Sequence, residues 1–446
     1  MRKPNILIVL SDQHGRPYSG CYGHPTVQTP NIDRLAERGV RFENAYCDSP
    51  LCVPSRSAFI TGKRVSTVEQ WDNNTVLEPA EPTMGHRLIN AGYDAVLCGR
   101  MHFNGDDKCH GFRAQIAKDP DANATIPNWA AGGEVPGHDL TDISGRPRVG
   151  SGVELDDLAE SMAIEYIERR SQEESPWAMV VGLKHPHGPW NAEQKYWDMY
   201  EEEEIQLPRG ENPADDHPIH NRNRRLRNMP EGGFTEEVQR RNRMGYYAVI
   251  SRMDDKIGNV LDALERSGQM ENTVVVYISD HGEMLGEHDL WMKSSLFEES
   301  IGVPMIISIP GREAETRTEN VTLKDLTATV CDYAGAELGG MDGRSFRGVL
   351  DGEVEWDNYM LCEYYATWTD RPLAAFRRDD LKLMAAPEDP VQLFDLARDP
   401  GETRDVSSAP EYRDARNELL KELESMWDGE KLWKRVIASQ KRRMGQ

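Results

Sequence analysis

Short apolar runs alternate with amphipathic segments through most of the chain. The runs are rich in β-branched residues and fall at 6–10, 95–98, 178–183, 273–279 and 304–308. Between them, apolar residues recur at helical spacing in the segments 30–39, 84–91, 155–169 and 238–264. Apolar runs without polar alternation are typical of parallel strands that are buried on both faces. The pattern therefore predicts an α/β fold with a large, mostly parallel sheet sandwiched by helices.

The pattern changes near residue 351. Four short runs predict a small antiparallel sheet, and they lie at 359–363, 374–377, 381–384 and 392–395. A charged helical stretch at 409–427 follows, and a basic tail at 431–445 comes last. We therefore predict an N-terminal α/β domain over residues 1–350 and a C-terminal α+β subdomain over residues 351–446.

The charge balance narrows the choice of partners. The 52 Lys and Arg residues face 76 Asp and Glu residues, which gives a net charge of −24. Such a surface repels phosphate backbones and anionic lipids, so we expect no nucleic-acid or membrane partner. The seven cysteines have no CxxC spacing, which argues against a disulfide scaffold and a structural zinc site. The apolar run at 6–10 is too short for a signal peptide, so we predict a soluble cytoplasmic protein, or a periplasmic or secreted one if a leader was removed.

Two charged clusters lie on either side of a segment that looks irregular. The acidic cluster occupies 201–204 and the basic cluster occupies 222–227. One interpretation is that both are solvated loop surface. The other is that the arginines of the 222–227 cluster face an anionic substrate.

Polar residues follow directly after three of the predicted strands. Asp12 and Gln13 follow the first strand, and Asp280 and His281 follow the strand at 273–279. In an α/β sheet such positions meet at the carboxyl edge, where active sites form. Two carboxylates, an amide and an imidazole predict an oxygen-rich site for a divalent cation, with one nitrogen ligand. The alternative is that these residues only cap helices. Arg100 and His102 follow the strand at 95–98 with alternate orientation.

The segment 49–63 reads SPLCVPSRSAFITGK. On its residues alone it could be a structural turn with a buried thiol at Cys52. Cys-X-Pro-Ser-Arg followed by Thr-Gly, however, resembles the signature of the type I sulfatases of the alkaline phosphatase superfamily. In that family the cysteine is oxidised to formylglycine, whose hydrated aldehyde is the nucleophile. The resemblance therefore implies that Cys52 is modified by a formylglycine-generating enzyme.

Further segments resemble family motifs, in the family's order. They are GRMHF at 99–103, KHPHGPW at 184–190, SDHGEMLGEHDLWMK at 279–293, LKDLTATVCDYAG at 323–335 and QLFDLARDPGE at 392–402. The element Trp71-Asp72-Asn73 and the stretch 101–112 resemble the choline sulfatase-like group in particular.

The resemblance assigns a role to each matching residue. The metal ligands are Asp12, Gln13, Asp280, His281 and the modified Cys52. Arg56 holds the aldehyde hydrate, His102 is the base that starts release of sulfate, and Asn73 donates a hydrogen bond to a sulfate oxygen. His187 and Lys293 bind the sulfate group and protonate the departing alcohol. His185 matches no family position, and we expect it to be structural.

Three departures from the family pattern bear on these roles. Many sulfatases have two adjacent aspartates where this chain has Asp12 and Gln13, and an asparagine where it has His281. Calcium is the usual family ion and the first candidate, but the softer ligand set makes manganese an alternative. Arg100 stands at a substrate-binding position where lysine is usual. The sequence also does not match the long C-terminal tail of choline sulfatases, which argues against choline as the alcohol.

The sequence therefore predicts a sulfatase that acts on a sulfated sugar or a small alkyl or aryl sulfate. A phosphonate monoester or phosphodiester hydrolase of the same superfamily is the alternative. An unmodified, inactive binding protein is a third possibility, and the complete set of candidate residues argues against it. A homo-oligomer is compatible with the sequence. Neither 106–152 nor 197–236 matches a pattern that identifies the alcohol.

Overall fold

The computed structural model describes residues 3–119, 151–209, 216–230 and 232–445. Its centre is an eight-stranded sheet with the order β5-β4-β6-β1-β7-β8-β2-β9. The strands are β1 (Asn5–Asp12), β2 (Val40–Phe42), β4 (Asp94–Gly99), β5 (Ala114–Gln115), β6 (Trp177–Pro186), β7 (Thr273–Ser279), β8 (Met305–Ser308) and β9 (Glu315–Arg317). Only β8 runs antiparallel to its neighbours, β7 and β2. The predicted mostly parallel sheet is confirmed.

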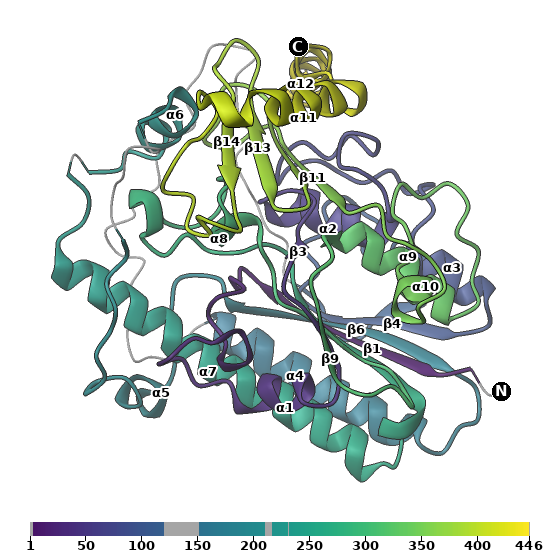
Figure 1. Cartoon of the computed structure of the whole chain (residues 1–446). Helices are drawn as coiled ribbons and strands as arrows, with labels where there is room; N and C mark the ends of the chain where they lie inside the picture. Colours follow the sequence, from purple (N-terminus) through teal and green to yellow (C-terminus); the bar gives the residue numbers. More distant parts are fainter. Residues whose placement is uncertain (1–2, 120–150, 210–215, 231, 446) are drawn as a thin grey trace.

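Helices cover both faces of this sheet (Figure 1). One face carries α1 (Pro30–Ala36), α4 (Ser151–Arg170) and α7 (Glu236–Arg266), and the other carries α2 (Cys52–Thr61), α3 (Met84–Asn90), α9 (Leu323–Tyr333) and α10 (Arg347–Leu350). Strand β1 shows why both layers are needed. Its Leu7 and Val9 pack in the core under α4 and α7, whereas Ile6, Ile8 and Leu10 pack in the core under α2 and α9. A strand with apolar residues on both faces is stable only when both faces are covered.

A second, four-stranded antiparallel sheet follows, in the order β11-β12-β13-β14. Its strands are β11 (Tyr359–Tyr364), β12 (Leu373–Arg378), β13 (Leu381–Ala385) and β14 (Gln392–Asp395), and helices α11 (Arg413–Met426) and α12 (Gly429–Arg443) come after them. The prediction of a small antiparallel sheet is confirmed. The division of the chain at residue 350 stays a prediction.

The predicted basic tail is a helix, α12, and the sequence analysis missed it. Leu432, Val436 and Gln440 are buried at intervals of four residues, which is the spacing of one helical face. The Asp428 side chain accepts a hydrogen bond from the Lys431 main-chain N at 3.0 Å and so caps the first turn. The many basic residues obscured this sparse apolar stripe.

The first interpretation of the cluster at 222–227, a solvated loop, is also wrong about the local structure. The cluster lies in and just after helix α6 (Pro218–Leu226), and two of its arginines turn inward. Arg222 forms an ion pair with Asp389. Arg227 is buried, donates to the Trp291 carbonyl and lies 4.6 Å from the centre of the Trp368 ring. Of the two interpretations, solvated surface fits Arg225, whose side chain is 68% exposed, and does not fit Arg222 or Arg227.

The remaining elements are short. They are the paired strands β3 (Ala45–Tyr46) and β10 (Val321–Thr322), helices α5 (Gln194–Asp198) and α8 (Glu298–Ile301), and single 3₁₀ turns at Gly20–Tyr22, Met270–Asn272, Glu287–Asp289 and Pro410–Tyr412. All seven cysteines are free thiols. Within the described ranges, every helix is too short or too polar to cross a bilayer. Most of the segment 106–152, which matches no pattern that identifies the alcohol, lies outside the described residues.

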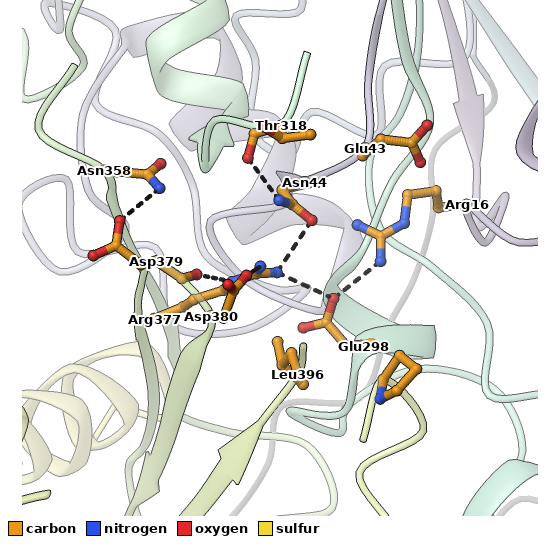
Figure 2. Close-up of a pocket in the computed structure, with 11 residues that line it drawn as sticks. Arg16, Glu43, Asn44, Glu298, Thr318, Asn358, Arg377, Asp379, Asp380 and Leu396 are labelled. Atoms are coloured by element: carbon orange, nitrogen blue, oxygen red, sulfur yellow. Dashed lines mark hydrogen bonds and ion pairs between the residues drawn. The ribbon is translucent and has the colours of Figure 1, made fainter. Parts of the chain in front are cut away.

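A polar cavity of about 520 Å³ lies between the turn that joins β12 to β13 and the loops of the α/β sheet (Figure 2). Glu298 is central to its charge balance, because it accepts from Arg16 at 3.0 Å and from buried Lys382 at 2.9 Å. The described residues that line this cavity include none of the predicted site residues. The ion pair of Lys382 with Glu298 therefore joins strand β13 of the second sheet to helix α8, which begins five residues after the predicted site residue Lys293.

Candidate active site

The carboxyl ends of β1 and β7 bring the two predicted aspartates together. The two strands are parallel neighbours, with Ser11 paired to Ser279, so Asp12 and Asp280 leave the sheet side by side. Both side chains are fully buried. Gln13 turns away from the strand direction at a φ of 72°, and its main-chain N donates to Asp280 Oδ1 at 2.9 Å. The register between β1 and β7 therefore places the carboxylates of Asp12 and Asp280 next to each other.

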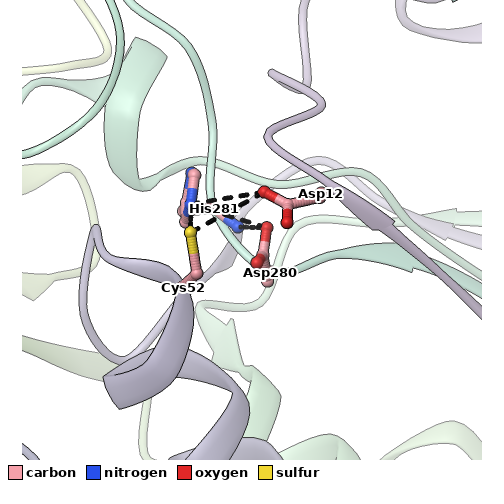
Figure 3. Close-up of side chains that lie close together, drawn as sticks. All are labelled: Asp12, Cys52, Asp280 and His281. Atoms are coloured by element: carbon pink, nitrogen blue, oxygen red, sulfur yellow. Dashed lines mark hydrogen bonds and ion pairs between the residues drawn. The ribbon is translucent and has the colours of Figure 1, made fainter. Parts of the chain in front are cut away.

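Cys52 enters the same space from the first turn of helix α2 (Figure 3). Its Sγ lies 3.3 Å from His281 Nε2 and 3.1 Å from Lys293 Nζ. Ligand atoms of Asp12, Cys52, Asp280 and His281 all lie within 4.8 Å of one another. Burial and the Asp12 carboxylate raise the pKa of the Cys52 thiol, but Lys293 and His281 together hold that pKa well below its ordinary value. The surroundings of the Cys52 sulfur therefore favour its anionic, thiolate form.

The donor set fits a divalent cation. His281 Nδ1 lies 3.0 Å from the Gly282 carbonyl, so Nδ1 carries the hydrogen and Nε2 presents its lone pair to the cluster. Two carboxylates complete a set with mixed oxygen and nitrogen donors. Gln13 lies beside the cluster, where its Oε1 accepts from Lys293 Nζ at 2.8 Å and its Nε2 donates to Glu283.

Two buried arginines balance the charge of these carboxylates. Arg56 Nε donates to Asp280 Oδ2 at 2.8 Å, and its Nη2 lies 3.2 Å from Asp12 Oδ2. Arg100 Nε donates to Asp12 Oδ2 at 2.6 Å. Although burial opposes the shift, the surrounding cations, Arg100 foremost, hold the pKa of Asp12 well below its usual range. Arg56 and Arg100 therefore contact the carboxylates directly, whereas the resemblance assigned them to the nucleophile and the substrate.

His102 lies behind Arg100, at a left-handed φ of 58°. Its main-chain N donates to Asp119 Oδ2 at 2.8 Å, and its Nδ1 lies 3.1 Å from Arg100 Nη2. A guanidinium only donates, so Nδ1 is the acceptor and Nε2 carries the hydrogen in this arrangement. In this arrangement Nε2 already carries a hydrogen and cannot accept a proton. His102 can act as a base through Nε2 only after the contact between Nδ1 and Arg100 is broken and the ring hydrogen moves to Nδ1.

His187 and Lys293 approach from two other segments. Lys293 lies between Met292 and Ser294, both of which have left-handed φ values, of 67° and 71°. His187 follows β6, and its Nδ1 lies 2.7 Å from the Gly188 carbonyl, which leaves Nε2 as an acceptor. Burial and the Lys293 ammonium hold the pKa of His187 well below its ordinary value. His185 instead pairs with buried Asp156 at 2.5 Å, which is the structural role expected for it.

Asn73 contacts the first turn of helix α2, which begins at Cys52. Its Oδ1 accepts from the Val53 main-chain N at 3.0 Å. Ten of the eleven residues predicted for the site therefore lie in the cluster around Cys52 or contact one of its members or neighbours. The eleventh, His187, interacts with the cluster through the charges of Lys293 and Asp12. Their catalytic and ligand roles stay predictions.

The sequence analysis missed two acidic residues at this site. Glu283 is buried and accepts from the main-chain N atoms of Leu285 at 2.9 Å and Met292 at 2.6 Å, besides Gln13. Its position three residues after Asp280 could have drawn attention to it. Asp119 holds His102 in place, and nothing in its local sequence indicated that role.

Comparison with known families gives two matches. Residues 4–336 match the Sulfatase family, and residues 286–428 match the family described as N-sulphoglucosamine sulphohydrolase, C-terminal. The first match spans more than half of the chain.

Curated relatives match over almost the whole chain. A protein of Rhizobium meliloti named choline-sulfatase is 35% identical over 426 residues, which cover 92% of this chain and 83% of the relative. A Clostridium perfringens protein named arylsulfatase is 27% identical, with 96% of each chain covered.

Solved structures share the fold. The phosphonate monoester hydrolase of Agrobacterium radiobacter superposes with a TM-score of 0.78 at 23% identity, with 95% of each chain covered. A protein solved with its substrate D-glucosamine-2-N,6-O-disulfate also gives a TM-score of 0.78, at 24% identity, with 97% of this chain and 98% of that one covered. At these identities the likeness establishes the architecture alone.

Proposed function

The chain belongs to the sulfatase family, and we propose that it hydrolyses sulfate monoesters with a nucleophile made from Cys52. One observation carries the proposal. Cys52 begins a helix and points into a buried cluster that contains two aspartates, one histidine and Lys293. A structural thiol has no need of neighbouring cations that favour its anion.

The proposed substrates are sulfated sugars and small alkyl or aryl sulfates. Relatives named for choline, aryl and N-acetylglucosamine sulfates support this range. The proposed partner in maturation is a formylglycine-generating enzyme, which reads the segment around Cys52.

Two groups that the family implies would complete the site. A hydrated formylglycine at position 52 would supply an oxygen nucleophile and a second hydroxyl, whose deprotonation would expel sulfate as the C=O bond re-forms. A divalent cation, calcium or alternatively manganese, would be held by Asp12, Gln13, Asp280 and His281 and would draw negative charge away from the reacting oxygens.

The chain's own residues divide the proton transfers between them. Lys293 lies 3.1 Å from Cys52 Sγ, so its ammonium is placed to attract a sulfate oxygen during attack. His187 is neutral while the site is empty of anions, because its pKa is depressed. A bound sulfate ester adds negative charge and favours the protonated ring, whose Nε2–H then faces the departing alcohol. His102 then takes the proton that starts release of sulfate.

The test of this function compares two ester classes on the matured protein. We expect kcat/KM for nitrophenyl sulfate to exceed that for bis(nitrophenyl) phosphate and for a phenyl phosphonate monoester by about tenfold or more, which corresponds to roughly 1.4 kcal/mol of transition-state preference. A preference of the same size for either phosphorus ester would assign the chain to the alternative hydrolase activity.

A second prediction concerns the leaving group. His187→Ala should slow hydrolysis of an alkyl or sugar sulfate by about 10²- to 10⁴-fold, the usual contribution of a general acid. The same change should slow hydrolysis of nitrophenyl sulfate far less, because nitrophenolate departs without a proton. Steady-state rates of the two esters with the wild type and the variant measure the difference. Equal losses on both esters would show that His187 only binds sulfate, and Lys293 would then be the candidate acid.

A further inference from the structure

Helix α12 holds the segment that leads to Asn73. Arg443, near the end of this helix, donates from Nη1 to Asp72 Oδ1 at 2.8 Å and from Nη2 to Asp72 Oδ2 at 2.6 Å. The Asp72 side chain is 1% exposed and that of Arg443 is 19% exposed. A two-pronged contact to a buried carboxylate fixes the direction of both groups. The pair thus ties the last helix to the residue next to Asn73.

A second contact between helix α12 and the segment 66–72 is made by Arg435, nearer to the start of the helix. Arg435 donates to the Ser66 carbonyl at 3.1 Å and to Glu69 at 2.9 Å, and its guanidinium lies 5.3 Å from the centre of the Trp71 ring. Arg442 is different, because its side chain is 66% exposed and it only approaches Glu69 at 3.6 Å. The helix therefore contacts the segment 66–72 through Arg435 and Arg443, whereas Arg442 forms only an exposed ion pair with Glu69, of the kind that contributes little to stability.

Segment 66–72 leads directly to Asn73, which contacts the first turn of helix α2, where Cys52 lies. Asn73 Oδ1 accepts from the main-chain N of Val53, the residue after Cys52, and this N–H is one that a helix start cannot satisfy internally. The Asn73 carbonyl accepts from Asn104 Nδ2 at 2.8 Å. Within the described part of the chain, Asn73 Nδ2 has no hydrogen bond, so both of its hydrogens are available to a ligand, while Oδ1 of the same amide contacts the residue after Cys52. The orientation of the Asn73 amide thus depends on where Asp72 is held.

We propose that Arg443 is a positioning residue for sulfate recognition. By pairing with Asp72 it keeps the Asn73 amide turned so that Oδ1 caps helix α2 and Nδ2 faces the sulfate group. Loss of Arg443 leaves a buried carboxylate without its main partner, and such a group moves toward water. This inference rests on the proposed function, because sulfate is the ligand that Asn73 would contact.

The first test compares Arg443→Gln with the matched control Arg442→Gln, its exposed neighbour. We expect Arg443→Gln to raise KM for nitrophenyl sulfate and the inhibition constant of inorganic sulfate about tenfold, with kcat changed far less, because Asn73 binds sulfate equally in the ground state and the transition state. Arg442→Gln should stay within about twofold of wild type in both constants. Arg443→Lys, which keeps the charge and loses one prong, should fall between the two. Unchanged sulfate binding in Arg443→Gln would overturn the proposal, even if the melting temperature fell.

A double substitution separates positioning from general stability. In an Asn73→Ala background the amide is gone, so adding Arg443→Gln should not weaken sulfate binding further. Fully additive losses would show that Arg443 acts by another route. The two hypotheses also fail differently. A wild type that binds inorganic sulfate but hydrolyses no sulfate ester contradicts the proposed function, whereas equal sulfate binding by wild type and Arg443→Gln contradicts the role of Arg443.

Discussion

Cys52→Ala should lower kcat for sulfate esters by about 10⁶-fold, the loss typical of removing a catalytic nucleophile. The reason lies in the geometry of the cluster. Lys293 and His281 converge on the position-52 side chain, and Asp12 lies just beyond at 3.8 Å, so no other described side chain can replace it. Steady-state rates on nitrophenyl sulfate measure the loss. Mass spectrometry of the wild-type peptide that spans Cys52 should show that its sulfur has been replaced by oxygen.

The matched control is Cys331→Ala. Cys331 is also fully buried, but it lies in helix α9, and its removal should affect stability and leave the catalytic rate near that of wild type. Cys52→Ser adds a sharper readout, because serine has one hydroxyl. It can accept a sulfate group but has no second hydroxyl to expel it, so at most one turnover per protein molecule is expected. A fully active wild type with an intact Cys52 thiol would contradict the assignment.

The second large effect concerns the two aspartates. Asp280→Asn and Asp12→Asn should each weaken binding of the divalent cation by more than the roughly 10- to 100-fold lost when a residue that only supports a ligand is removed. Turnover should fall with the bound metal, because either change leaves a single carboxylate in the cluster and removes one carboxylate from Arg56, and Asp12→Asn also removes the partner of Arg100. Metal content by mass spectrometry and rates after adding back calcium or manganese measure both effects.

Asp254→Asn is the control for loss of a buried carboxylate. Asp254 accepts from the main-chain N atoms of Asn31 at 3.0 Å and Ile32 at 2.8 Å, where it stabilises the start of helix α1. This variant should lose stability and keep its metal. If chelation that removes all metal leaves the wild-type rate unchanged, the cluster is not a catalytic metal site.

The central sheet and the site around Cys52 could be predicted from sequence because their signals are local. Five uninterrupted apolar residues predict a buried strand at 6–10, and a polar pair after such a strand has to lie at its carboxyl edge. The cysteine signature occupies one helix start, α2, so its residues stay together in any fold that forms that helix.

The missed features depend on contacts between distant residues. Arg443 reaches a carboxylate 371 positions away, and Arg100 turns to Asp12 from a strand two places along the sheet. No local pattern specifies such partners. Asp119 is similar, since it contacts the site through the main chain of His102 and lies 3.7 Å from the Arg100 guanidinium. Helix α12 was missed for a different reason, because its few apolar positions are spread among basic residues.

The burial of the Cys52 side chain, which is 1% exposed, bears on when the proposed oxidation of this residue can take place. An enzyme that oxidises this cysteine has to reach its sulfur, and in the folded chain helix α2 packs that sulfur between two strand ends and the Lys293 segment. We therefore expect the proposed conversion of Cys52 to precede the docking of helix α2, while the chain is still emerging or only partly folded. A host that lacks the oxidising enzyme would accumulate a stable, correctly folded protein that later addition of that enzyme cannot activate. Under the proposed function, a molecule of this protein becomes active only if its Cys52 is converted in the interval between synthesis and folding.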